Sequence, residues 1–250
     1  MKKRWIFLMA GGLALLSLGF IFSRELEVEE ITLQFEHLPP ELEGFRIVHL
    51  ADWQIPKNLV TLEDLVEVVG QQNPDLIVLS GDMIDRSARD FSDMQELAAL
   101  LPEIAPTYAV SGNHEFNNRG NWREAYGDLP IIDETYVDFG SWLLVGAQDD
   151  MPMPEVPEGY FTILLAHRPR QYPADLTFSG HVHGGHWKLP WIGGLLSPDH
   201  LLFPRFTNGV YSFDDGTKLV LSRGIGNSIL PLRFLNRPHI IVITLERTAI

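Results

Sequence analysis

A repeated pairing of short apolar segments with metal-binding residue types is the feature that most constrains this chain. Five times, an apolar run is followed at once by polar side chains. Loops at strand ends are where a rigid scaffold presents functional groups, and a glycine beside such a cluster lets the backbone approach closely. The five clusters are Asp52-Trp53-Gln54, Gly81-Asp82-Met83-Ile84-Asp85, Gly112-Asn113-His114-Glu115, His167, and Gly180-His181-Val182-His183-Gly184-Gly185.

Each cluster taken alone also has a purely structural explanation. An isolated aspartate after a strand usually caps the next helix, and Asn113 could simply shape a turn. His-x-His on a short loop already indicates a metal site, and the ordered set of five makes coincidence a minor possibility. Lone histidines outside the set, such as His37, His49, His200 and His239, are more often surface or hydrogen-bonded core residues.

The first half of the chain alternates between strand-like and helix-like segments. Apolar strands are expected at residues 45–51, 76–80 and 108–111, and helical spacing of apolar residues marks 59–72 and about 93–101. Successive strand, helix and strand units imply an α/β fold, in which parallel strands carry the functional loops at their ends.

The second half is richer in short β-type runs and has few helical stretches. It therefore predicts a second sheet packed on the first, with helices outside. The runs cover residues 142–145, 161–166, 176–178, 210–213, 219–222 and 240–245.

The N-terminus differs in composition from the rest of the chain. Lys2-Lys3-Arg4 precedes an uncharged run over residues 5–22, and charge resumes at Arg24-Glu25. The run is near the lower limit for crossing a bilayer, and no clear cleavage site follows it, so we expect one uncleaved transmembrane signal anchor. The basic flank should stay in the cytoplasm, so we expect a single-pass cell-membrane protein with its main domain outside the cytoplasm. A cleaved signal peptide is the alternative.

These patterns divide the chain into three parts. We expect a signal anchor at 1–24, a linker and first strand at 25–43, and one domain at 44–250. The net charge of −14 argues against broad nucleic-acid binding, which needs a basic surface. Because the chain has no cysteine, any metal ion must be held by His, Asp, Glu, Asn or Gln.

Taken in order, the five clusters resemble the signature of the calcineurin-like metallophosphoesterases, which reads D-x-H, GDxxD, GNHE, a lone histidine and GHxHGG. The resemblance runs from about residue 45 to about residue 245. It implies a four-layer α/β/β/α sandwich of two mixed sheets. The tail further resembles a bacterial membrane-associated branch related to enzymes that cleave UDP-diacylglucosamine pyrophosphates, and its residues are Pro190-Trp191, Ser222-Arg223-Gly224 and Pro231-Leu232-Arg233-Phe234.

The resemblance also implies two divalent metal ions and a ligand for each position. Asp82 would bridge the ions, with Asp52 and His183 on metal one. Metal two would be held by Asn113, His167 and His181. This nitrogen and oxygen set suits Mn, Fe, Zn or Co better than Mg or Ca.

The same resemblance implies a mechanism in which the metals lower the pKa of a bridging water, so that hydroxide attacks phosphorus directly. His114 would lie beside that site and stabilise the transition state or protonate the leaving oxygen. Asp85 would not contact the metal ions, and would orient His114 or another ligand by a hydrogen bond to its ring nitrogen.

Three further features have both a functional and a structural interpretation. Arg223 could bind substrate phosphate or form a structural ion pair, and Arg168 has the same ambiguity. The apolar stretch at 187–206 is ordinary core by default, and an acyl-binding wall is its functional interpretation.

One position departs from the signature, because Gln54 stands where the family usually has histidine. Its amide oxygen is a poorer donor than imidazole and should weaken metal one. The membrane-associated branch usually reads GHxHGGQ, and here that final position is His186. We therefore expect either that His186 ligates metal one while Gln54 takes a hydrogen-bonding role, or that His186 faces solvent or packs on Trp187.

The sequence thus predicts a hydrolase of a phosphodiester or pyrophosphate, with a small-molecule or lipid-linked substrate. The alternative is a catalytically weak or silent member of the fold that serves in protein interaction. The near-complete ligand set favours the enzyme. A nuclease is less favoured because of the acidic charge and the anchor.

Overall fold

The computed structural model describes residues 25–185, 188–189, 193–194, 205–227, 233 and 235–248. The expected anchor at 1–24, His186, and most of the apolar stretch at 187–206 lie outside these residues. Within the described part of the chain, no helix has the length and apolar character needed to cross a membrane.

The first sheet has five strands and is mixed. In it, β13 runs antiparallel to β2, whereas the other neighbouring pairs are parallel. Its strands are, in spatial order, β1 (Glu27–Phe35), β13 (His239–Arg247), β2 (Arg46–Leu50), β3 (Leu76–Leu79) and β4 (Thr107–Ala109).

The second sheet has six strands and is also mixed. Its four central strands are parallel and both edge strands are antiparallel to their neighbours. The order is β11 (Gly209–Ser212), β12 (Lys218–Leu221), β8 (Leu176–Ser179), β7 (Phe161–Ala166), β6 (Trp142–Ala147) and β5 (Thr135–Asp138). A separate two-stranded ladder joins β9 (Lys188–Leu189) to β10 (Gly193–Gly194).

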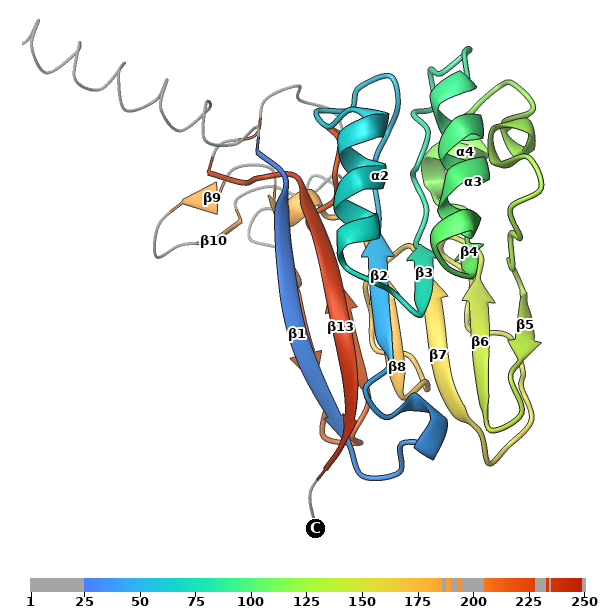
Figure 1. Cartoon of the computed structure of the whole chain (residues 1–250), viewed down its shortest axis with the longest axis vertical. Coiled ribbons are helices and arrows are strands. Elements are labelled where there is room, and N and C mark those ends of the chain that lie inside the picture. Colours follow the sequence, from blue (N-terminus) through green and yellow to red (C-terminus); the bar gives the residue numbers. More distant parts are fainter. Residues whose placement is uncertain are drawn as a thin grey trace, which may run out of the picture.

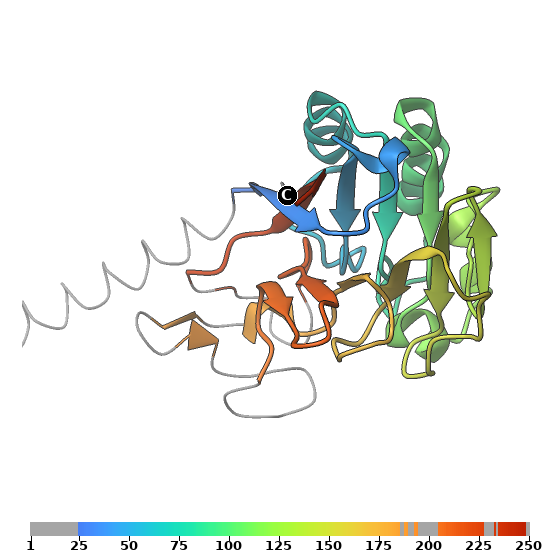
Figure 2. The same cartoon turned by 90° about the horizontal axis from the view of Figure 1, so that it is seen from below.

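Side chains alternate between the two faces of each strand, so each sheet packs against a core on both of its faces. Ile47 and Val78 of the first sheet meet Ile163 and Phe178 of the second in a shared core. The opposite face of the first sheet is covered by α2 (Leu62–Gln71) and α3 (Ser92–Ile104), as Figures 1 and 2 show. The α/β class with two mixed sheets, predicted from the sequence, is confirmed.

Loops replace the outer helical layer that the resemblance implies for the second sheet. Within the described residues, the outward side chains Leu143, Val145 and Leu164 pack against Met153 and Tyr172, which lie in segments without helix. Three prolines between 152 and 157 explain this, since proline disfavours a helix interior.

Strand β13 does not belong to the second sheet, where its place in the sequence suggested it would lie. Ile240 and Val242 face the helix-covered core, and Ile241 and Ile243 face the core between the sheets. The first sheet lies between these two cores, so a strand whose side chains enter both of them belongs to the first sheet. The acidic segment before the domain is likewise a strand of this sheet, because β1 pairs with β13 along its whole length.

Helix α3 continues through Pro102, where the sequence predicted a stop. Leu101 is fully buried and Ile104 packs on the same core. Burial on both sides of the proline outweighs the backbone hydrogen bond that it removes. The Ala105 amide closes the last turn by donating to the Leu101 carbonyl at 3.2 Å.

Candidate metal centre

The five polar clusters meet at one end of the two sheets. Strands β2 and β3 of the first sheet and β6 and β7 of the second point the same way in Figure 1, so the loops that follow them lie together. Three side chains form the closest group: ligand atoms of Asp82, His167 and His181 all lie within 4.8 Å of one another. The His167 Nε2 atom is 3.2 Å from Asp82 Oδ2 and 3.2 Å from His181 Nδ1.

The loops reach this geometry through backbone conformations that non-glycine residues seldom adopt. Asp52, Gln54 and Asp82 have φ near +54°, +53° and +53°, and His181 and His183 have +74° and +48°. Left-handed backbone at bulky residues costs free energy and is concentrated at functional sites. Its recurrence in three of the clusters indicates that the surrounding contacts, rather than local preference, set these positions.

Burial and mutual attraction control the charges of the closest group. Burial opposes ionisation of Asp82, yet the positive charges of His167 and His114 lower its pKa. Burial likewise opposes a charged His167, but the Asp82 carboxylate raises the pKa of that imidazole to about 10. The His167 Nδ1 lies 2.9 Å from the Ser80 carbonyl, which turns Nε2 toward Asp82.

A second group lies beside the first and contains the residues expected on metal one. The His183 Nε2 is 3.5 Å from Asp52 Oδ1 and 3.2 Å from Gln54 Nε2. Both Asp52 oxygens accept the His181 backbone N–H, at 3.2 and 3.0 Å. Burial, with a smaller contribution from Asp82, raises the pKa of Asp52 to about 7.

Two side-chain oxygens in the centre have no hydrogen-bond donor within the described residues. They are Gln54 Oε1 and Asn113 Oδ1, and both atoms are buried. A buried polar atom without a partner is costly and calls for an explanation. Because Asn113 was expected to be a ligand and Gln54 stands at a ligand position of the family signature, oxygen donors with free lone pairs fit a divalent cation at this place.

His114 and Asp85 form a pair next to Asp82. The His114 Nδ1 is 3.1 Å from Asp85 Oδ2, and its backbone N–H donates to Asp82 Oδ1 at 2.7 Å. Lys57 Nζ also lies 2.8 Å from Asp85 Oδ2. Although burial lowers the pKa of His114, the hydrogen bond to Asp85 and the charge of Asp82 raise it above the usual value.

Arg86 is a residue of this region that sequence reasoning missed. Its backbone follows Asp85 directly, and its Nη2 lies 3.1 Å from His114 Nε2. The residue is exposed, so the guanidinium stands between the buried pair and solvent. Its position next to the GDxxD block was the signal available in the sequence.

Glu115 was also missed as a residue with a role of its own. Its fully buried carboxylate accepts the backbone N–H groups of Asp82 and Gly112 at 2.8 Å each and of Ile84 at 3.2 Å. Tyr126 donates its hydroxyl to the same carboxylate at 2.9 Å. Glu115 thus ties the loop after β3 to the loop after β4.

The two ambiguous arginines have different surroundings. Arg223 is buried and its Nη2 lies 2.9 Å from Glu27 Oε1 on β1, which is the structural ion pair left open by the sequence. Arg168 lies closer to the centre, with Nη1 3.1 Å from His181 Nε2 and Nε 3.2 Å from Asp149 Oδ1.

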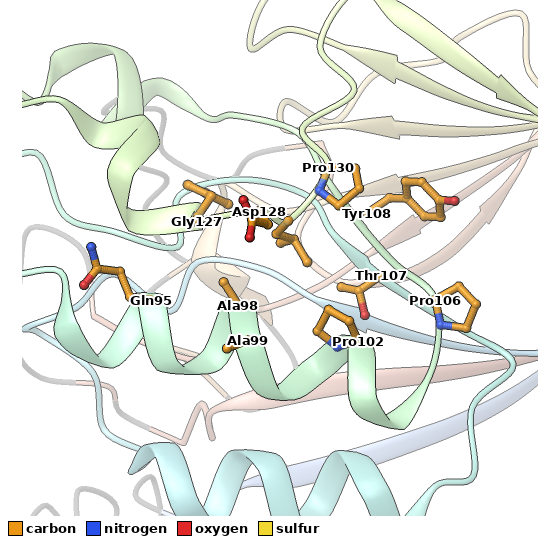
Figure 3. A pocket seen from close by; sticks show the side chains of 12 residues that line it. Gln95, Ala98, Ala99, Pro102, Pro106, Thr107, Tyr108, Gly127, Asp128 and Pro130 are labelled. Carbon is orange, nitrogen blue, oxygen red and sulfur yellow. The ribbon is translucent and has the colours of Figure 1, made fainter.

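A cavity of about 580 Å³ lies elsewhere, between α3 and the segment that follows η2 (Trp122–Tyr126). Ala98, Pro102, Thr107 and Pro130 are among the residues around it (Figure 3). None of the expected metal ligands among the described residues lines it. The candidate centre is therefore separate from this cavity.

Known proteins resemble the chain over most of its length. The sequence model of the calcineurin-like phosphoesterases matches residues 45–185. The protein named uncharacterized metallophosphoesterase YkuE, from Bacillus subtilis (strain 168), is 30% identical over 275 residues, covering 96% of this chain and 92% of that protein.

Two other relatives have more informative names. Phosphodiesterase YaeI of Escherichia coli (strain K12) is 30% identical over 228 residues, covering 80% of this chain and 82% of that protein. A transmembrane protein with metallophosphoesterase domain from Danio rerio is 26% identical, covering 88% of this chain and 57% of that protein. Since the family match alone spans more than half of the 250 residues, the chain belongs to the calcineurin-like phosphoesterase family.

Proposed function

We propose that the protein is a metal-dependent hydrolase of a phosphodiester or pyrophosphate. The observation that carries the proposal is the close group of Asp82, His167 and His181 ligand atoms at the strand ends of two sheets, together with the buried, unpartnered oxygens of Gln54 and Asn113 on the same set of loops. Nitrogen and oxygen donors of this mixture suit Mn, Fe, Zn or Co.

Seven side chains would hold two divalent ions. In the proposed assignment Asp82 is shared, and Asp52, His183 and Gln54 complete metal one. Bound ions would supply charge neutralisation for the phosphoryl oxygens and a water of lowered pKa. The residues of metal two are Asn113, His167 and His181.

His114 would hold and transfer the proton in this scheme. With Nδ1 hydrogen-bonded to Asp85, the imidazole keeps Nε2 for the reacting groups. Proton donation from Nε2 to the leaving oxygen is then the role we assign to His114. Arg86 reaches the same atom from the solvent side, and its planar guanidinium is suited to a phosphoryl oxygen of the substrate.

We also propose a substrate class and a location for the protein. The relative named a phosphodiesterase supports a diester, and the relative named a transmembrane protein supports the anchor expected at 1–24. A lipid-linked pyrophosphate, as in the branch related to UDP-diacylglucosamine pyrophosphatases, would suit an enzyme held at a bilayer, with the domain outside the cytoplasm. Arg223 is a less favoured substrate ligand because Glu27 already pairs with it.

The test is hydrolysis by the purified protein after removal of metal by a chelator. Bis-p-nitrophenyl phosphate and a lipid pyrophosphate are assayed with and without added Mn²⁺. We expect Mn²⁺-dependent turnover of at least one of them. A folded protein that hydrolyses neither would favour the catalytically silent alternative.

A further inference from the structure

Arg233 is a buried cation on the metal-one side of the candidate centre. The residue is 4% exposed, and its Nη2 lies 3.5 Å from Nδ1 of His183. The opposite ring nitrogen of His183 lies 3.5 Å from Asp52 Oδ1. The His183 ring is therefore placed between a guanidinium and the carboxylate with which it would share a metal ion.

The guanidinium has carbonyl partners but no salt-bridge partner among the described residues. It donates to the carbonyls of Gly226 and Arg223 at 3.0 Å each and of Arg237 at 3.3 Å. By contrast, Arg223 and Arg237 have carboxylate partners in Glu27 and Glu25.

Carbonyl oxygens satisfy N–H groups without cancelling a full buried charge. Asp52 supplies an attracting negative charge to Arg233. A divalent ion at Asp52 would therefore have to share that carboxylate with a permanent cation.

The contact between Arg233 and His183, like the charge of Arg233, disfavours a metal ion at Asp52 and His183. An arginine can only donate, so its contact with His183 uses the lone pair of Nδ1. The opposite atom, Nε2, faces Asp52 Oδ1 and the amide Nε2 of Gln54, which is also a donor, so the neutral ring offers its one lone pair to only one of two donors. A metal ion needs that Nε2 lone pair, and a proton moved to Nδ1 would face the N–H of Arg233.

The residues assigned to metal two are arranged differently. The Ser80 carbonyl accepts from His167 Nδ1 and leaves Nε2 directed at Asp82. Arg168 makes the same kind of contact with His181, with Nη1 3.1 Å from Nε2, but its side chain is 27% exposed and pairs with Asp149, so its charge is partly neutralised, unlike that of Arg233.

We propose that Arg233 makes the two metal positions unequal, so that the first ion binds at Asp82, His167 and His181 and the second binds more weakly at Asp52 and His183. The proposal rests on the two-metal assignment of the proposed function. Arg233 is a positioning residue in this scheme, since it acts through His183 and Asp52 without touching substrate.

The first experiment is a Mn²⁺ titration of the metal-free protein, followed by electron paramagnetic resonance. We expect the first equivalent to give the spectrum of isolated Mn²⁺, and the spin-coupled pair to form at concentrations at least about tenfold higher. A coupled pair already dominant at the first equivalent would overturn the inference while leaving the proposed function in place. If the protein bound none of Mn²⁺, Fe²⁺, Zn²⁺ and Co²⁺, the proposed function itself would fail.

The second experiment separates the charge of Arg233 from its shape. Arg233→Gln and Arg233→Met remove the charge, and Arg233→Lys keeps it. In either neutral variant that unfolds cooperatively, the gap between the two Mn²⁺ affinities should narrow about tenfold, whereas the Lys variant should keep it. Arg237→Gln is the matched control, because this arginine is 38% exposed and pairs with Glu25. An unchanged gap in a folded neutral variant would contradict the role of Arg233.

Discussion

The Asp85 carboxylate lies 3.1 Å from Nδ1 of His114, and the other ring nitrogen of that histidine lies 3.9 Å from Asp82 Oδ2. One carboxylate thus orients the ring and another faces it. Lys57 and the Ser87 backbone N–H hold Asp85 itself, at 2.8 Å each. Asp85 therefore fixes the His114 ring at Nδ1, and the opposite nitrogen, Nε2, lies between Asp82 and Arg86, whose Nη2 is 3.1 Å away.

Replacing His114 with alanine should slow hydrolysis while both metal ions stay bound. The residue is assigned to proton transfer, so the loss in kcat should be about 10²- to 10⁴-fold. Turnover and bound metal are measured on the same sample, by a Mn²⁺-dependent assay and by elemental analysis. Loss of metal from the variant would show that His114 is a ligand.

Replacing Asp82 with asparagine should abolish metal-dependent hydrolysis and leave the fold intact. The substitution removes the one negative charge shared between two cations, while an amide oxygen can still accept the His114 N–H. Circular dichroism and thermal unfolding check the fold, and metal analysis should show fewer ions per chain. Near wild-type turnover in the pure variant would refute the bridging role.

The sequence predicted which polar side chains lie close together better than it predicted the contacts around them. Asp82, His167 and His181 were identifiable because each follows an apolar strand, and parallel strands bring such residues together. The role of Glu115 depends on two loops approaching each other, and that of Arg233 on a contact with a residue 50 positions away. Local patterns contain no information about such pairings.

The assignment of strands to sheets shows the same limit. The apolar runs at 161–166 and 240–245 look alike in sequence, yet β7 lies in the second sheet and β13 in the first. Both are buried on two faces, and a run without alternation does not indicate its neighbours. Pairing of β1 with β13 joins the two ends of the described chain and is set by the fold as a whole.

Stability should fall in acid because of His49. Burial, reinforced by the charge of His239, lowers the pKa of His49 from 6.5 to about 3. The unfolded chain then binds more protons than the folded one between these values. The contribution of His49 to the free energy of unfolding is complete above the pKa that this imidazole has in the unfolded chain, and it is lost as the pH falls below that value.

Urea unfolding of the metal-free protein at about pH 7.5 and about pH 5.5 measures this loss, which should be about 1.4 kcal/mol for one such histidine. His49→Gln keeps a hydrogen-bonding partner for Ser80, which lies 2.7 Å from His49 Nε2, and does not titrate. That variant should lose correspondingly less stability between the two conditions. The exposed His37→Gln is the control and should behave as wild type. Equal losses in all three proteins would exclude His49 as the source.

The location of the domain can be tested independently of its chemistry. Lys2-Lys3-Arg4 before the apolar run predicts that a reporter fused after Ile250 is active outside the cytoplasm. Deleting residues 1–24 should release the hydrolase from membranes with its activity retained. Labelling of the C-terminus only after the cytoplasm is opened would reverse the topology and move the substrate to the inner leaflet.

The last prediction concerns Gln54, which replaces the histidine of the family motif. Its Oε1 is buried without a donor among the described residues, and its Nε2 lies 3.2 Å from His183 Nε2. His186 lies outside the described residues. If the two positions have exchanged roles, His186→Gln alone should weaken the second metal ion about tenfold or more, because an amide is a poorer ligand than imidazole. Adding Gln54→His should then restore binding.

A double-mutant cycle on metal affinity decides whether the two positions act together. The measured quantity is the Kd of the second Mn²⁺ ion in the wild type, both single variants and the double variant. Coupling requires that the two effects do not add, as expected for residues that share one ion. Additive effects would mean that the two positions are not coupled, and metal one would then be a weak or exchangeable site.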